Sequence, residues 1–185
     1  MTLLSIFPLV SGLLLALSIT INGAAVQERD HLTPQEVDLV KEAQELDKRI
    51  EIFIKAADRR LLALNGVDQA SAKQLKKDAE KWGELPSGSR SELVADIARI
   101  LDEAITNIDD VSAHDERNPL IARSLRNLAA EATRLVNQLK PLSGQAKSDG
   151  EVASFEQLME NAQSILEAAN KLPPPADKKS EKRKN

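Results

Sequence analysis

Two histidines, His31 and His114, are the side chains of this chain best suited to proton transfer near neutral pH. His31 precedes the first predicted helix, and His114 lies in the sequence DDVSAHDERNP between two predicted helices. A catalytic triad needs a histidine held beside a nucleophile, and the chain has no G-x-S-x-G element to expose a serine on a sharp turn. The sequence therefore predicts that the protein is not an enzyme.

Carboxylates near His114 are the candidates for binding a metal ion, namely Asp109, Asp110, Asp115 and Glu116. Their spacing does not match an EF-hand loop, and acidic residues also gather in loops because water solvates them there. The absence of Cys excludes thiolate ligands, c-type haem attachment and disulfides. Di-iron helical proteins need paired Glu-x-x-His motifs, which the predicted helices lack. We expect no metal and no cofactor.

The first 25 residues, MTLLSIFPLVSGLLLALSITINGAA, contain no charged side chain and end in the small residues typical of a signal-peptidase site. We therefore predict a signal peptide over residues 1–25 and a mature protein, periplasmic or secreted, that begins at Val26. The alternative is an uncleaved anchor, because residues 3–21 are long enough to span a thin bilayer.

Apolar residues that recur at alternating spacings of three and four predict four long helices. Capping or stop signals bound these segments, such as the capping box at Thr33 and Glu36 and the Asn65-Gly66 stop. Ser89, Asn118 and Ser148 cap the other three, and prolines follow the last two. The four apolar stripes are Ala43, Leu46, Ile50, Phe53, Ala57, Leu61 and Leu64; Val94, Ile97, Leu101, Ala104, Ile108 and Val111; Ile121, Leu125, Leu128, Ala132, Leu135 and Leu139; and Val152, Phe155, Met159, Ala162, Leu166 and Ala169.

The predicted fold is all-α: an up-down antiparallel bundle of four main helices plus a shorter connecting helix. The connecting helix falls within residues 67–83, although this stretch could instead continue the first main helix. Aromatic residues make up only 2% of the chain, which suits a core of Leu, Ile, Val and Ala. We expect one bundle domain over residues 26–172 and a disordered basic tail over residues 173–185.

The stretch DKRIEIFIKAADRRL, residues 47–61, is interpreted as one edge of a bundle helix whose charged side chains face solvent. Ile52 points away from the apolar face of that helix. The fourth helix carries a second apolar stripe at seven-residue spacing, formed by Leu158, Ile165 and Leu172. Two interpretations are open: these residues are covered by the connecting helix, or together with Ile52 they form a partner surface.

The segment DHLTPQEVDLVKEAQELDKRIEIFIKAADRRLLAL, residues 30–64, resembles exported helical proteins of bacteria, acidobacterial ones in particular. The resemblance implies export and carries no activity.

These features predict an exported, non-enzymatic protein that binds another macromolecule in the cell envelope. The alternatives are a carrier that holds a small ligand in the bundle interior, and a membrane-anchored structural protein if residues 3–21 are retained. The partner is an unknown protein or a second copy of the chain. The basic tail adds weak contact with anionic surfaces, and the net charge of −4 argues against nucleic acid.

Overall fold

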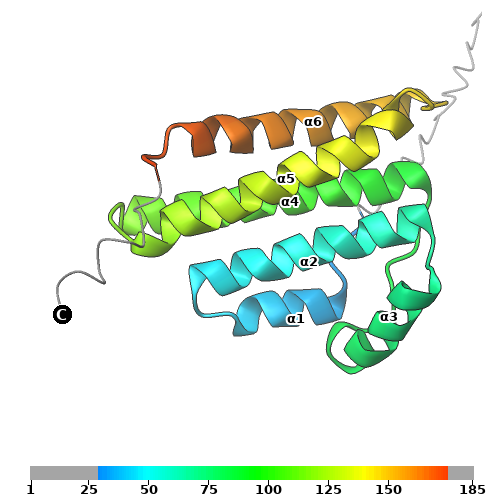
Figure 1. Ribbon diagram of the computed structural model, residues 1–185, viewed down its shortest axis with the longest axis horizontal. Helices are drawn as coiled ribbons and strands as arrows, with labels where there is room; N and C mark the ends of the chain where they lie inside the picture. Colours follow the sequence, from blue (N-terminus) through cyan, green and yellow to red (C-terminus); the bar gives the residue numbers. More distant parts are fainter. Residues whose placement is uncertain (1–28, 175–185) are drawn as a thin grey trace, which may run out of the picture.

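The computed structural model describes residues 29–174, and the regular structure in this range consists of α-helices (Figure 1). The prediction of an all-α chain is confirmed. The helices are α1 (Pro34–Glu42), α2 (Leu46–Asn65), α3 (Gln69–Trp82), α4 (Arg90–His114), α5 (Pro119–Ser143) and α6 (Asp149–Asn170).

The helix ends form where the sequence predicts them in most cases. Thr33 and Ser89 each cap a helix and exchange hydrogen bonds with a glutamate three residues later, so both capping boxes are present. Gly66 ends α2 with a φ of 84°, a conformation that favours glycine. Pro141 was expected to end its helix, but α5 continues through it to Ser143.

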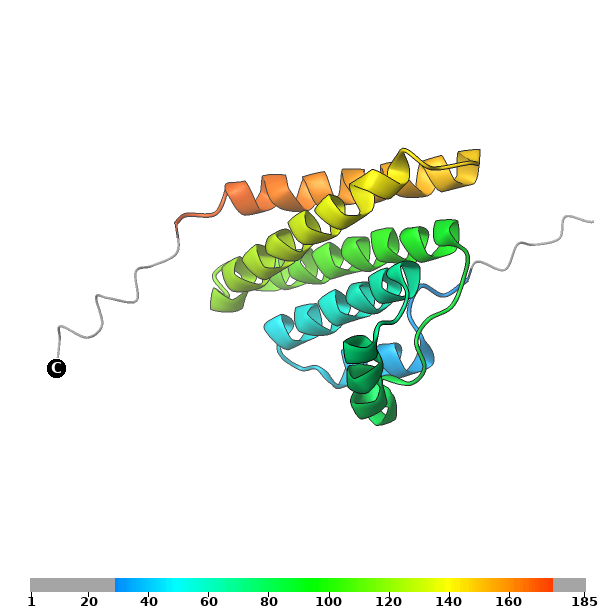
Figure 2. The ribbon, with the colours of Figure 1, turned by 45° about the vertical axis from the view of Figure 1, so that its right-hand side comes forward.

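The core lies between the four long helices, where α4 contacts α2, α5 and α6, and α5 contacts α2 and α6 (Figure 2). Aliphatic side chains fill it, as the composition predicts. Its buried members include Ile50, Phe53 and Leu61 of α2, Ile97, Leu101 and Ile108 of α4, Leu128, Leu135 and Leu139 of α5, and Phe155, Leu158 and Ile165 of α6.

The first predicted helix is broken, which the apolar spacing did not indicate. The chain leaves the helical conformation at Ala43, and α1 lies beside α2 instead of extending it (Figure 1). Arg49 donates two hydrogen bonds to the carbonyl oxygen of Ala43, at 3.3 and 3.2 Å, so this freed acceptor is satisfied. Side-chain hydrogen bonds therefore stabilise the break at Ala43, although neither Gly nor Pro lies between α1 and α2.

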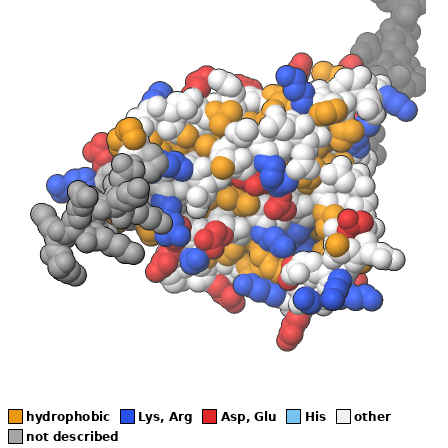
Figure 3. Space-filling view, viewed as in Figure 1, with side chains coloured by type: hydrophobic (Ala, Val, Ile, Leu, Met, Phe, Trp, Pro, Cys, Tyr) orange, Lys and Arg blue, Asp and Glu red, His pale blue; other side chains and the backbone are white. Residues whose placement is uncertain are grey.

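The connecting helix is separate: α3 begins after the Asp68 cap and ends at Gly83, where φ is 67°. It lies at the edge of the molecule, where its backbone comes close to α1 and its side chains reach α2 (Figures 1 and 2). Trp82 is its one buried residue. Lys and Arg side chains are prominent over this region in the space-filling view (Figure 3).

The core face of α6 is rotated from its predicted position. Leu158 and Ile165 are 0% exposed, whereas Val152, expected in the core, is 42% exposed. The side chains that cover Leu158 and Ile165 come from the main helices, because α6 contacts α4 and α5 but not α3. Leu158 and Ile165 are thus covered from within the chain, but the interpretation that the connecting helix covers them is wrong.

The signal peptide predicted over residues 1–25 lies outside the described residues, as does the tail from residue 175 onward. Within residues 29–174 no helix combines the length and apolar character needed to cross a membrane.

A matched pair of substitutions on α6 tests this rotated face. Ile165→Ala should lower the free energy of unfolding by about 2–5 kcal/mol, because truncation of a buried aliphatic side chain removes burial and leaves a cavity. Val152→Ala should change it by less than about 0.5 kcal/mol, as is usual for exposed positions. Urea unfolding of both variants measures the difference, and a larger loss at Val152 would contradict the observed face.

Candidate functional site

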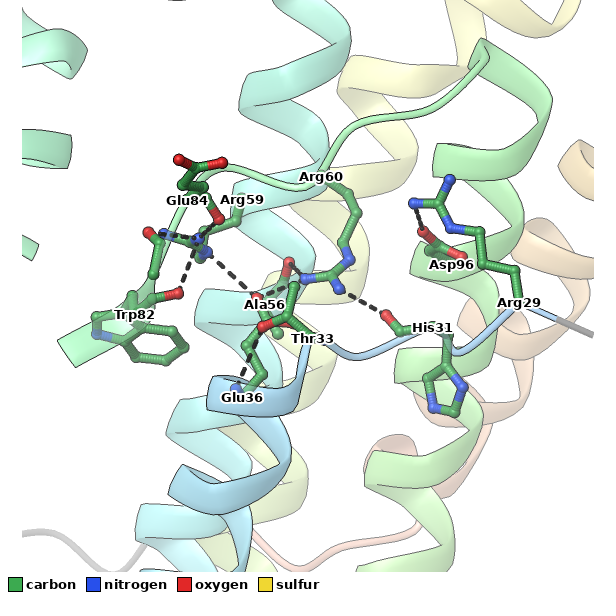
Figure 4. Close-up of polar contacts among 11 residues, drawn as sticks. Arg29, His31, Thr33, Glu36, Ala56, Arg59, Arg60, Trp82, Glu84 and Asp96 are labelled. Carbon is green, nitrogen blue, oxygen red and sulfur yellow. Dashed lines mark hydrogen bonds and ion pairs between the residues drawn. The ribbon is translucent and has the colours of Figure 1, made fainter. Parts of the chain in front are cut away.

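A cluster of buried charges is the most unusual feature of the described structure (Figure 4). Glu36 of α1 is 0% exposed, and Arg59 and Arg60 of α2 are 2% and 1% exposed. One carboxylate oxygen of Glu36, Oε1, accepts from Arg59 Nε at 3.2 Å and from Arg60 Nη1 at 2.6 Å. Charged side chains are seldom buried unless paired, so these three residues depend on one another.

The start of α1 positions the Glu36 carboxylate. Its second oxygen, Oε2, accepts from the backbone N–H of Thr33 at 2.9 Å, and the Thr33 hydroxyl accepts from the backbone N–H of Glu36 at 3.3 Å. The capping box and the ion pairs therefore share one carboxylate. Both of its oxygens accept hydrogen bonds from the protein, and the side chain is fully buried, so the carboxylate does not face an open site.

Arg59 ties the end of α3 to α2. Its Nη2 donates to the carbonyl oxygens of Trp82 at 3.0 Å and Gly83 at 3.3 Å, and also to that of Glu84. The guanidinium carbon lies 5.8 Å from the centre of the Trp82 ring, within range of a cation–π contact. Burial lowers the pKa of Arg59, and the neighbouring Glu36 opposes that shift.

Arg60 extends the cluster toward the N-terminal arm, residues 29–33. Its guanidinium donates to the carbonyl oxygens of Ala56 at 2.9 Å and His31 at 2.6 Å. Its Nε is buried and has no hydrogen-bond partner among the described residues.

Asp96 of α4 anchors the arm from the other side. It is 2% exposed and accepts from Arg29 Nη2 at 2.9 Å, while Arg99 donates to the carbonyl oxygen of Arg29 at 3.0 Å. Burial raises the pKa of Asp96, and the charges of Arg29, Arg60, Arg99 and His31 act against that rise. The Nε2 atom of His31 lies 2.7 Å from the Oε2 atom of Glu103.

This arrangement fastens peripheral segments to the main helices. Glu36, Arg59 and Arg60 connect α1, the end of α3 and the arm to α2, and Asp96 connects the arm to α4. Apart from Arg60 Nε, the donors and acceptors described above face one another or backbone groups. We therefore assign the cluster a structural role.

The side chains predicted as a partner surface do not form one. Leu158 and Ile165 are in the core, Leu172 is partly buried against it, and Ile52 is partly exposed on α2. Charged side chains of the same helix pair along and across its surface: Glu51 pairs with Lys48 at 3.1 Å, and Lys55 pairs with Asp78 of α3 at 3.2 Å.

Sequence reasoning placed Arg59 and Arg60 on a solvent-facing edge, and the structure corrects this. A signal was present, because Arg60 follows the core residues Ala56 and Ala57 by four and three positions and so lies on their side of the helix. A fully buried arginine is usually paired with an acid. Glu36 is that acid, but only the fold brings it close.

The loop near His114 is exposed, and the His114 Nδ1 is 2.7 Å from the carbonyl oxygen of Asp110 in its own helix. In the part of the chain that the structure describes, no three His, Asp or Glu side chains are grouped as metal ligands.

Comparisons with known proteins gave no match to a family model, a curated protein or a solved structure. The chain's own residues are thus the basis for assigning a function.

Replacing Glu36 tests the buried cluster. Glu36→Gln keeps the shape of the side chain but leaves two buried guanidinium groups without a counter-charge, so the free energy of unfolding should fall by about 3–5 kcal/mol. Glu42→Gln, on the exposed side of the same helix, should change it by less than about 0.5 kcal/mol. Urea unfolding at neutral pH measures both, and equal small effects would show that the cluster is not stabilising.

The raised pKa of Asp96 predicts a pH dependence. The native state binds the Asp96 proton more tightly than the unfolded state, so protonation favours folding. This contribution is present below the ordinary aspartate pKa of about 4 and is lost as the pH rises through the higher folded value. The stability of the wild type relative to Asp96→Asn should therefore decline from about pH 4 upward. Urea unfolding of both proteins across pH checks the sign, and a difference that grows with pH would contradict it.

Proposed function

We propose that this protein is an exported, non-enzymatic helical protein that acts by binding another macromolecule in the cell envelope. Its helices α2, α4, α5 and α6 would form the expected up-down antiparallel bundle, which the contacts among them support. The bundle serves as a rigid body, and α3 presents the binding surface.

The observation that carries this proposal is the free basic side of α3. Lys73, Lys76, Lys77 and Lys81 are all exposed, and none of them forms an ion pair with a described residue. Many other basic side chains of the main helices are paired. Examples are Arg90 with Glu151, Arg123 with Asp47 and Arg134 with Asp58. Four unpaired lysines thus lie together on one short helix, whereas Lys140 and Lys171, which also form no ion pair with a described residue, lie apart at the ends of α5 and α6.

A carrier that holds its ligand inside the bundle has less support. Aliphatic side chains fill the space between the main helices, and the pockets lie outside it. One pocket beside the N-terminal arm, about 490 Å³, is lined by charged residues such as Arg29, Arg99 and Glu103. Such an open polar pocket differs from the mostly apolar cavities that enclose small ligands.

The membrane-anchored alternative concerns residues 3–21 and is compatible with the same surface. An anchored protein and a mature protein would both present α3 to the envelope. The two differ in mass, because cleavage before Val26 removes 25 residues.

Co-sedimentation with isolated bacterial envelopes tests the proposal. The mature chain from Val26 should sediment with them, and Lys73→Gln/Lys77→Gln should shift it to the supernatant. Glutamine retains helix propensity, so α3 should remain folded. Lys140→Gln/Lys171→Gln removes the same charge from exposed positions elsewhere and should sediment like the wild type. Failure of the wild type to sediment, or equal behaviour of all three proteins, would contradict the proposal.

A further inference from the structure

We propose that the partner of α3 is an anionic phospholipid bilayer, on which the lysine side of this helix lies. This inference rests on the proposed function and names the chemistry of the partner. The relevant observations are the arrangement of the lysines, the way in which α3 is fixed, and the position of the N-terminal arm.

The lysines occupy one side of α3. At 100° per residue, Lys73, Lys76, Lys77 and Lys81 fall within an arc of about 140°. Glu80 is the one acidic side chain in that arc. Four cations against one anion give this side a positive charge, although the whole chain has a net charge of −4.

The opposite side of α3 faces the rest of the molecule. Asp78 pairs with Lys55 of α2, and Trp82 is buried beneath Arg59. Leu75 lines a pocket of about 190 Å³ together with Leu62 of α2. These contacts fix the orientation of α3, so its lysines are held pointing away from the main helices.

The N-terminal arm lies at the same end of the molecule as the end of α3. A shared pocket of about 450 Å³ is lined by Arg29 and Asp30 of the arm and by Glu84, Leu85 and Pro86, which follow α3. Gln35, just after the arm, packs against Gly83 at the α3 terminus. Chain that precedes residue 29 therefore joins the described structure close to α3.

This position connects α3 to the predicted apolar leader. Seven residues, 22–28, separate the segment 3–21 from Arg29 and can span at most roughly 25 Å. A leader inserted in a bilayer would hold the α3 end of the protein beside the lipid headgroups. After cleavage, attraction between the lysines and anionic headgroups would keep the mature protein there.

An amphipathic insertion of α3 is not needed for this contact, because the helix keeps its apolar side chains on the inner side. The binding is electrostatic, and each lysine near an anionic surface strengthens partitioning about fivefold. It should therefore be weakened by salt, since counterions screen exposed charges.

Vesicle co-sedimentation tests the inference. The mature chain should bind vesicles of phosphatidylglycerol mixed with phosphatidylcholine at low ionic strength, and should not bind phosphatidylcholine alone. Lys73→Gln/Lys77→Gln should lower the partition coefficient roughly 30-fold. The control Lys140→Gln/Lys171→Gln should stay within about twofold of the wild type, because those lysines lie elsewhere on the surface. Circular dichroism of each variant confirms that the fold is retained.

A second variant separates α3 from the basic tail. In it glutamine replaces Lys178, Lys179, Lys182, Arg183 and Lys184. This tail variant should retain most of the vesicle binding. Loss of binding in the tail variant alone would assign lipid contact to the tail and overturn the inference.

The remaining outcomes distinguish this inference from the proposed function. Sedimentation with envelopes that depends on α3, without binding to anionic vesicles, would show that a different envelope macromolecule is the partner. The lipid inference would then fail while the proposed function stands. If the protein sediments with neither envelopes nor vesicles, both the lipid inference and the proposed function are contradicted.

Discussion

The placement of the N-terminal third of the structure depends on one buried carboxylate. In an uninterrupted helix, Glu36 and Arg59 would be about 35 Å apart, because each of the 23 intervening steps advances 1.5 Å. Instead the Arg59 Nε and the Glu36 Oε1 are 3.2 Å apart, which requires the chain to turn back between these two residues. The break at Ala43 is therefore the geometric condition for the ion pair, and α1 lies beside α2 as its consequence.

That ion pair also determines how α3 is displayed. Arg59 cannot be buried without acceptors for its Nη2 donors, and the carbonyls of Trp82, Gly83 and Glu84 supply them. The end of α3 is thus held at the level of Arg59 on α2. The hydrogen bonds from the buried Arg59 of α2 hold the inner side of α3, and they thereby fix the direction in which the lysines on its outer side point.

Periodicity and caps predicted most of the helical structure because they act locally. The stripes of α4 and α5 are correct: Ile97, Leu101, Leu128 and Leu135 are all in the core. The predicted core face of α6 was partly wrong because two overlapping heptad patterns of apolar residues are present in this helix. The contacts of α6 with α4 and α5 determine that Ile165 is buried in the core. Local spacing cannot resolve that choice.

The candidate sites were harder to predict because they depend on pairs that are distant in sequence. Glu36 resembles any capping-box glutamate until Arg59 and Arg60 meet it. The lysines of α3 resemble any solvated face until the partners of the other cations are known. In both cases, the role of a charged side chain depends on which charged residues the fold places beside it. Where the fold supplies a counter-charge, as Glu36 does for Arg60, the charged residue holds separate segments together. Where no described residue supplies one, as for Lys77, the charge is exposed on the surface.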